Sequence, residues 1–297
     1  MEALKAAGLN KGDLVGICAP SNAVEHRRDE FEKARERFEE ATGLRTLVAP
    51  NVFRKHYYSA GTPEERLSDF HSLFENDEVK AIVFAAGGNT AIDLLPGLDF
   101  DLIARNPKIV AGISDATTLL SSMTVKTGLI TFLGFEFLEF AHRDMNYTVE
   151  SIQKNWFEGG KGLLEANPNW EEFDGIPTSY PGTWQTIREG EASGRLLGGN
   201  YQSFFQLLNT DFGYDFSGSI LFFETYRLAK RQIHKALMQF ELHGVLEKIN
   251  GMVVGYCLES DDPEILGNEQ PLAETILEVV DDYDFPIMQI GEIGHRV

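Results

Sequence analysis

Four apolar runs alternate with helical segments in the first part of the chain, and this alternation limits the fold more than any other sequence feature. The runs are apolar along their whole length, which is typical of strands buried on both faces of a parallel sheet. The intervening helices would then cover the two faces. We therefore predict an N-terminal α/β domain with a doubly wound parallel sheet. The predicted strands are residues 14–20, 44–50, 79–88 and 108–113.

Two of the predicted helices have recognisable ends. The charged amphipathic segment at residues 25–43 stops at Gly43, and glycine is common just after a helix. Residues 62–65, TPEE, combine a capping threonine, a proline in the first turn and a glutamate three positions after the threonine. On the helix that follows, we expect Arg66 and Asp69 to form a solvated ion pair.

A change in composition divides the chain. Residues 159–184 are rich in Gly, Pro, Asn and acidic residues and lack a sustained hydrophobic period, which indicates a segment between domains. We place the N-terminal domain at residues 1–160, the interdomain segment at 161–190, and a smaller C-terminal α/β domain, mainly β, at 191–297. The strands predicted for the smaller domain are residues 217–224, 251–258 and 285–290.

The acidic composition excludes some classes of partner. A formal net charge of -20 argues against nucleic acid, because phosphate binding needs a basic surface. No stretch approaches the roughly 18 consecutive apolar residues of a membrane span, and the N-terminus lacks a signal-peptide core. Cys18 and Cys257 have no metal-binding or redox spacing, which favours buried thiols in a reducing compartment. We expect a cytoplasmic protein without metal, cofactor or membrane association.

A serine stands at the junction of the fourth apolar run and the next helical segment, in the stretch KIVAGISDATTLL at residues 108–120. Ser114 has two interpretations. Serine is a favoured N-cap residue, so it would simply begin the helix. The order of strand, Gly, any residue, Ser, any residue and a small residue is also close to the nucleophile elbow, with Ala116 in place of the second glycine. The second interpretation requires a base and an orienting group elsewhere.

Glu224 and His295 could be these groups, because each follows a predicted strand or the loop beyond it. Taken alone, Glu224 is a favourable first-turn residue of a helix, and His295 is an ordinary surface histidine. Together with Ser114 they give Ser, Glu and His in chain order. All three lie beyond strand ends, where α/β proteins place their chemistry.

A glycine turn follows the third apolar run, in AAGGNTA at residues 85–91. Its backbone N–H groups could stabilise an oxyanion, with the amide of Asp115 as the natural second donor. The turn could instead cradle a phosphate. That reading is weaker, because neither a G-x-G-x-x-G pattern nor a Walker lysine follows.

Seven stretches, spread in order over nearly the whole chain, carry a resemblance to a known family. They are GDLVGICAPS, YYSAGTPEERLSDFHSLF, AGGNTAIDLLPGLDFDLIARNPKIVAGISDATTLL, KTGLITFLG, GRLLGGN, ILFFE and GEIGH. They resemble the LD-carboxypeptidase and microcin C immunity family of serine peptidases. GGN followed by LLP, then NPK and SDATTLL, is more similar to the microcin-immunity branch than to the murein-recycling branch.

The resemblance implies a metal-free Ser-His-Glu catalyst in a cleft between the two domains. Matched motif by motif, Ser114 in GISDA would be the nucleophile and His295 in GEIGH the base. Glu224 in LFFE would orient the base, and Gly88 and Asp115 would supply the oxyanion amides. Members of the family are commonly homodimers, so we expect a homodimer here.

The resemblance also implies two classes of substrate. One branch removes a D-amino acid from a murein tetrapeptide. The other cleaves the amide that joins an aminoacyl group to a nucleotide-like toxin, and stacks the base on an aromatic ring. Trp170, in the variable segment between the domains, and Asn89, in the glycine turn, are the candidate substrate-binding residues. Packing between domains is the alternative role of Trp170.

The sequence departs from the family pattern at four places. Ile113 stands where the family usually has Tyr, and Phe135 where it usually has Pro. Thr225 and Tyr226 replace an acidic pair. The chain ends two residues after His295, whereas relatives continue, so we expect either a sequence truncated at its end or a site that is less well walled than usual.

We predict a serine hydrolase that cleaves an amide in a peptidyl- or aminoacyl-nucleotide toxin. The first alternative is a murein tetrapeptide L,D-carboxypeptidase of cell-wall recycling. The alternative from another class is a non-catalytic two-domain protein that binds a small molecule. In each case the expected partner is a small peptide or an aminoacyl-nucleotide.

Overall fold

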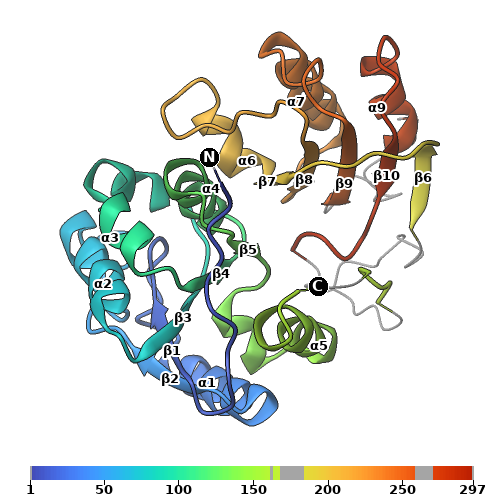
Figure 1. Ribbon diagram of the computed structural model, residues 1–297. Helices are drawn as coiled ribbons and strands as arrows, with labels where there is room; N and C mark the ends of the chain where they lie inside the picture. Colours follow the sequence, from blue (N-terminus) through green and yellow to red (C-terminus); the bar gives the residue numbers. More distant parts are fainter. Residues whose placement is uncertain (1, 161–162, 168–183, 258–269, 296–297) are drawn as a thin grey trace. The chain divides into compact units, whose positions relative to one another are not determined.

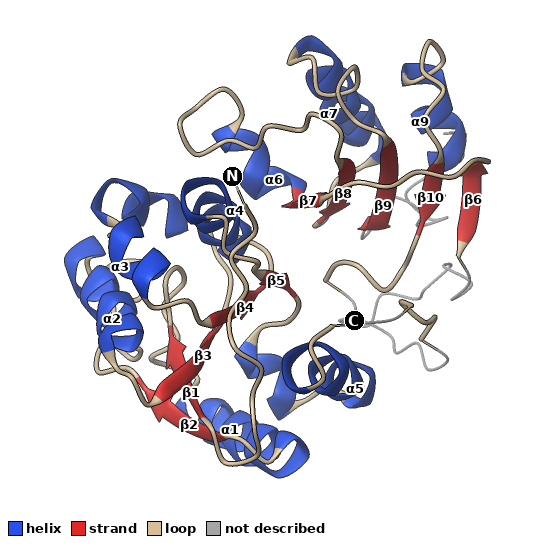
Figure 2. Ribbon diagram, viewed as in Figure 1, coloured by secondary structure: helices blue, strands red, loops and turns tan. Residues whose placement is uncertain are grey.

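The computed structural model describes residues 2–160, 163–167, 184–257 and 270–295. The chain forms two compact units, Met1–Leu163 and Leu164–Val297. Each unit contains one five-stranded sheet (Figures 1 and 2). No helix within the described ranges is both long and apolar enough to cross a membrane.

The sheet of the first unit is parallel throughout and has the strand order β2-β1-β3-β4-β5. The order reverses between β1 and β3, so the chain leaves these two neighbouring strands in opposite directions along the sheet. At such a switch point the loops after the strands separate and leave room for a ligand. The strands are β1 (Leu14–Cys18), β2 (Arg45–Val48), β3 (Val79–Phe84), β4 (Ile109–Gly112) and β5 (Phe132–Leu133).

Helices cover both faces of this sheet (Figure 1). On one face lie α1 (Arg28–Thr42), the 3₁₀ helix η2 (Phe137–Ala141), α5 (Asn146–Ile152) and the π-helical turn η3 (Gln153–Phe157). On the other lie α2 (Pro63–Glu75), the 3₁₀ helix η1 (Ala91–Gly97), α3 (Phe100–Arg105) and α4 (Ala116–Thr127).

Local sequence explains how these helices begin, end and pack. In α1, Phe31, Ala34 and Phe38 recur at helical spacing and are fully buried, which gives the helix one apolar face toward the sheet. It ends at Gly43, whose φ of 71° is left-handed and favours glycine. Thr62 caps α2 with the predicted capping box, because its side chain accepts a hydrogen bond from the amide of the glutamate three residues later.

The sheet of the second unit has the order β6-β10-β9-β8-β7, with β6 antiparallel to β10 and the other pairs parallel. Its strands are β6 (Gln185–Arg188), β7 (Leu196–Asn200), β8 (Ile220–Thr225), β9 (Gly251–Cys257) and β10 (Ile287–Gln289). Its helices are α6 (Tyr201–Phe204), the 3₁₀ helix η4 (Phe205–Leu207), α7 (Lys230–Leu242) and α9 (Leu272–Val279).

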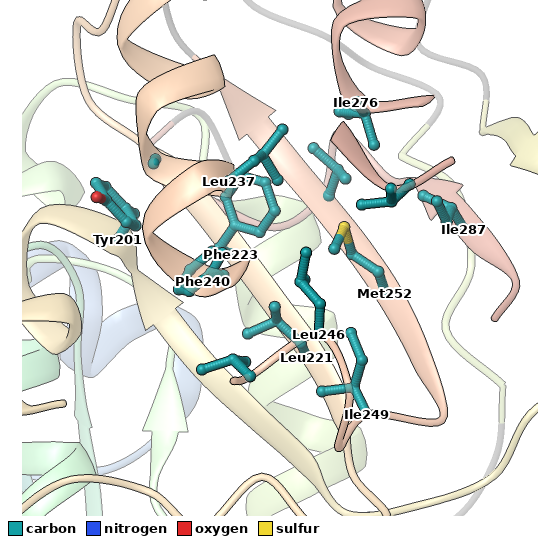
Figure 3. Close-up of a cluster of buried hydrophobic side chains, with 14 of the residues drawn as sticks. Tyr201, Leu221, Phe223, Leu237, Phe240, Leu246, Ile249, Met252, Ile276 and Ile287 are labelled. Atoms are coloured by element: carbon teal, nitrogen blue, oxygen red, sulfur yellow. The ribbon is translucent and has the colours of Figure 1, made fainter. Parts of the chain in front are cut away.

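The core of the second unit lies between its sheet and α7 and α9 (Figure 3). Leu221 and Phe223 of β8 and Met252 of β9 face Leu237 and Phe240 of α7, and all five side chains are 0–2% exposed. Burial of this kind contributes about 1.5–3 kcal/mol for each large side chain relative to leaving it exposed. The core therefore fixes the carboxyl end of β8, where Glu224 lies.

The predicted class of fold is confirmed, since a doubly wound parallel sheet is joined to a smaller α/β unit in one chain. Several elements were not predicted, among them α3, β5, α5, β6, β7 and α9. The edge strand β6 falls in the predicted interdomain segment, where its short polar sequence QTIR has no strand pattern. The helix α9 is only eight residues long and follows residues outside the described ranges.

Candidate active site

The backbone at Ser114 has the shape of a nucleophile elbow. Ser114 is the middle residue of the three between β4 and α4, and its φ of 62° is left-handed, which is uncommon for a residue other than glycine. Small neighbours permit the tight turn, because a Cβ on Gly112 would lie 2.7 Å from the Cβ of Ala116. The N-cap of α4 is Asp115 rather than Ser114. The capping interpretation of the serine therefore has no support from the backbone.

The glycine turn after β3 lies directly against this elbow. A Cβ on Gly87 would stand 2.7 Å from the Cβ and 3.0 Å from the Oγ of Ser114. Gly88 has a φ of 147°, and a Cβ there would lie 2.4 Å from the Oγ of Ser21. Only glycine leaves room for these approaches. Asn89, the predicted substrate-binding residue of this turn, is exposed.

The side chain of Asp115 joins three loops of the first unit. Its Oδ2 accepts a hydrogen bond from the hydroxyl of Ser21, which follows β1, at 2.5 Å, and from the amide of Ala91, at the start of η1, at 2.8 Å. The Ser21 hydroxyl oxygen in turn accepts from the amide of Thr90 at 3.0 Å. Asp115, Ser21 and Thr90 are all buried, so water competes little for these bonds. The residue after the candidate nucleophile thus ties its own loop to two others.

Arg66 does not form the predicted solvated pair with Asp69. Both side chains are buried, at 3% exposure each. The guanidinium Nη1 of Arg66 donates to the carbonyl oxygens of Pro20 at 2.6 Å and Thr90 at 2.9 Å, while Asp69 accepts hydrogen bonds from Asn51. The expectation was wrong because the loops after β1 and β3 fold back over α2, which helical spacing alone does not reveal.

Glu224 and His295 form a close pair within the second unit. Glu224 is fully buried near the end of β8, and its Oε2 lies 2.7 Å from Nδ1 of His295. The other carboxylate oxygen accepts a hydrogen bond from Nδ2 of Asn200, the last residue of β7, at 2.9 Å. Gly255 and Gly294 allow the backbone to close around the pair, since a Cβ on either would come within 3.0 Å of the Cβ of Glu224. Each oxygen of the Glu224 carboxylate therefore has a hydrogen-bonding partner.

An aromatic ring lies beside the histidine. The Tyr226 ring centroid is 4.7 Å from that of His295, with 37° between the planes, and the guanidinium of Arg227 lies 5.3 Å from the Tyr226 centroid. Tyr226 is one of the residues that replaces the acidic pair of the family pattern. Its contact limits the positions that the imidazole ring can take.

The remaining candidates from the sequence are two tryptophans in the predicted interdomain segment. Trp170 is outside the described residues. Trp184 donates its indole N–H to Oε2 of Glu292 at 2.8 Å, an anchor that the sequence did not reveal. Among the described residues there is no group of three or more His, Cys, Asp or Glu side chains placed to hold a metal ion.

An elbow serine beside a glycine turn in one α/β unit, and a buried Glu–His pair in the other, are the parts from which serine hydrolases are built. Residues 15–134 match the family model described as the LD-carboxypeptidase N-terminal domain, and residues 193–297 match that of the LD-carboxypeptidase C-terminal domain. The chain belongs to the LD-carboxypeptidase family of serine peptidases.

Two curated relatives are similar over nearly the whole chain. A probable murein peptide carboxypeptidase of Bacillus subtilis is 30% identical, covering 98% of this chain and 86% of the relative. The microcin C7 self-immunity protein MccF of Escherichia coli is 27% identical, covering 98% of this chain and 88% of the relative. A solved structure of MccF in complex with glutamyl sulfamoyl guanosine superimposes with a TM-score of 0.88 at 26% identity, covering 98% of this chain and 90% of that one.

Proposed function

We propose that this serine peptidase cleaves an amide in an aminoacyl- or peptidyl-nucleotide compound, with Ser114 as nucleophile, His295 as general base and Glu224 as the orienting carboxylate. The observation that carries the proposal is the 2.7 Å contact between a fully buried Glu224 and Nδ1 of His295. A buried carboxylate on one imidazole nitrogen fixes the tautomer and directs the other nitrogen toward a hydroxyl.

The chemistry follows from this arrangement. With the Nδ1 proton donated to Glu224, Nε2 of His295 takes the proton of the Ser114 hydroxyl as the oxygen attacks the scissile carbonyl carbon. The Glu224 carboxylate stabilises the imidazolium that forms. The amides of Gly88 and Asp115 donate to the oxyanion. His295 then protonates the leaving nitrogen, and water hydrolyses the acyl-enzyme by the same route in reverse.

The nucleotide part of the proposal draws on the relatives. MccF has been solved with glutamyl sulfamoyl guanosine, an aminoacyl group attached through a sulfamoyl group to a nucleoside. For a compound of this kind we propose that Trp170 stacks on the base, which is worth about 1–3 kcal/mol, and that Asn89 lines the acyl end. The predicted homodimer remains part of the proposal.

A second candidate function is murein tetrapeptide carboxypeptidase. The observation in its favour is the Bacillus subtilis relative, whose name is that of a murein peptide carboxypeptidase and which has the higher identity of the two curated relatives described above. Both candidates use the same three catalytic residues, so they differ only in substrate.

One experiment tests the mechanism and separates the substrates. The wild-type protein and Ser114→Ala are incubated with a murein tetrapeptide and with an aminoacyl sulfamoyl-adenosine, and products are identified by mass spectrometry. We expect cleavage of the adenosine compound by the wild type, and a loss of about 10³-fold or more in kcat for the variant, because triad members act as a unit. Cleavage of the tetrapeptide alone would favour the second candidate. A variant that keeps most of its activity would rule out the mechanism.

A further inference from the structure

A second buried carboxylate lies on the loop that carries the candidate base. Glu292 follows β10 by three residues and precedes His295 by three, and both residues are 8% exposed. Its Oε2 accepts a hydrogen bond from the indole N–H of Trp184 at 2.8 Å, and its Oε1 accepts one from the backbone amide of Asn167 at 2.7 Å. All four residues belong to the second unit. The side chain of Glu292 therefore holds the histidine loop to two segments that precede it by more than a hundred residues.

The edge strand β6 brings Trp184 to this loop. β6 is antiparallel to β10, and its first residue, Gln185, pairs with the last residue of β10, Gln289. In an antiparallel pair, the chain that precedes one strand lies beside the chain that follows the other. Trp184 therefore lies next to the loop after β10, and its indole N–H continues the contact between the two chains as far as Glu292.

The backbone between Glu292 and His295 is fixed at one point and contains a glycine. The carbonyl oxygen of Ile293 accepts a hydrogen bond from the amide of Tyr256, in β9, at 2.6 Å. Gly294 follows, with a φ of 128°. Because glycine has more backbone freedom than any other residue, the position of His295 depends on how firmly the residues before Gly294 are held. Ile293 supplies a backbone contact and Glu292 a side-chain contact.

Resting on the proposed function, we propose that Glu292 is a positioning residue for the general base. By binding Trp184 and Asn167 it fixes the loop that keeps Nδ1 of His295 on the carboxylate of Glu224, 2.7 Å away. Proton transfer by the imidazole requires one orientation of the ring, and a displacement of about 1 Å can cost about 10²-fold in rate. Because Glu292 acts through the loop and not on the substrate, its loss lowers kcat and leaves KM nearly unchanged.

The test removes the hydrogen bonds of Glu292 in the full chain. Trp184→Phe keeps an aromatic ring and deletes only the indole N–H. Glu292→Gln keeps the shape of the side chain, but its amide nitrogen is a donor that faces another donor, so one of the two hydrogen bonds is lost. We expect each variant to lower kcat for an aminoacyl sulfamoyl-adenosine by about ten-fold or more, with KM changed less than about three-fold. The double variant should lose no more than Glu292→Gln alone, because its amide nitrogen no longer faces the indole N–H.

Arg188→Met is the matched control. Arg188 is the last residue of β6, and its guanidinium donates to the carbonyl oxygens of Tyr283 and of Val280, the latter at 2.9 Å. The variant therefore loosens the opposite end of the same strand, and it should leave kcat unchanged. Equal kcat losses in Arg188→Met and Trp184→Phe would overturn the inference, because the contact would then only support the strand.

Nitrogen NMR of the histidine side chains reads the position of the base without a substrate. In protein labelled with ¹⁵N-histidine, the Nδ1 and Nε2 shifts of His295 report its hydrogen bond to Glu224, and they are assigned by their absence from His295→Gln. These shifts should move in Trp184→Phe and Glu292→Gln and stay in place in Arg188→Met. Unchanged shifts or an unchanged kcat in the first two variants would overturn the inference. Failure of the proposed function is recognised separately, by a wild type that cleaves neither substrate or by an alanine variant of the candidate nucleophile that stays active.

Discussion

At the scale of the residue, Ser114 holds a conformation that favours glycine. Its φ of 62° costs an L-residue about 1–2 kcal/mol relative to the right-handed region. The buried neighbours Ile113 and Asp115 fix the turn on both sides, so the serine cannot relax. Strain of this kind is common where a side chain must be presented for chemistry.

Glycine should therefore fit this position better than alanine does. We expect Ser114→Gly to be more stable than Ser114→Ala by about 1 kcal/mol, because alanine keeps the left-handed strain, while both variants lose hydrolysis. Urea unfolding followed by circular dichroism measures the difference. Ala116→Gly, two residues further on in α4, should instead destabilise the protein, lowering the free energy of unfolding by about 0.5–1 kcal/mol. A Ser114→Gly protein less stable than Ser114→Ala would show that the elbow relaxes in solution.

At the scale of the element, the loops after β1, β3 and β4 behave as one assembly because Asp115 connects them. The amide proposed to donate to the oxyanion and the carboxylate that ties the loops belong to the same residue. Loss of the tie should therefore move the amide of Asp115 relative to the turn that carries Gly88. Small displacements of oxyanion donors cost activity more than they cost binding.

We expect Asp115→Ala to lower kcat by about 10- to 100-fold with KM changed less than about three-fold. Asp115→Asn should recover most of the loss, because its amide oxygen can accept from both Ser21 and Ala91. Steady-state kinetics on any cleaved substrate measures this. Asp99→Ala is the control. Asp99 lies at the start of α3 and accepts a hydrogen bond from the amide of Leu102 at 2.8 Å, so this variant also removes an aspartate at a helix N-terminus but leaves the three loops unchanged. Equal kcat losses in both alanine variants would reduce Asp115 to a structural role.

Sequence patterns predicted the elements well and the contacts between loops poorly. Ser114 was recognisable because a strand, a small-residue turn and a helix are local features. Glu292 and Ser21 gave no such signal, since their partners Trp184 and Asp115 lie 108 and 94 residues away. Arg66 was misread for the same reason. When a residue's role depends on contacts between loops that are distant in sequence, no hydrophobic period or motif spacing indicates that role.

At the scale of the whole molecule, the candidate catalytic residues are divided between two units. Ser114 and the glycine turn belong to Met1–Leu163, and Glu224 and His295 belong to Leu164–Val297. Each unit has its own sheet and its own apolar core. The division also extends to the two cysteines, because Cys18 lies at the end of β1 and Cys257 at the end of β9, both buried.

Each cysteine should report on the unit that contains it. Phe38→Ala in the first unit and Phe240→Ala in the second remove fully buried rings, which costs about 3–5 kcal/mol. We expect Phe38→Ala to accelerate alkylation of Cys18 and Phe240→Ala to accelerate that of Cys257, each with little effect on the other. Timed labelling of the native protein at about pH 8, with mass-spectrometric peptide mapping, measures both rates. If either variant accelerates both cysteines equally, the two units open together.

Because both thiols are buried, their alkylation rates report on the opening of the strands that contain them. Burial, and to a smaller extent the charge of Asp69, raises the pKa of the Cys18 thiol well above its usual range. The thiolate that reacts with alkylating reagents is therefore scarce until the strand opens and the pKa falls toward about 8.5. If a bound substrate analogue slows the alkylation of Cys18 and of Cys257 to different degrees, the difference shows which unit it stabilises more. The measurement needs no probe attached to the protein.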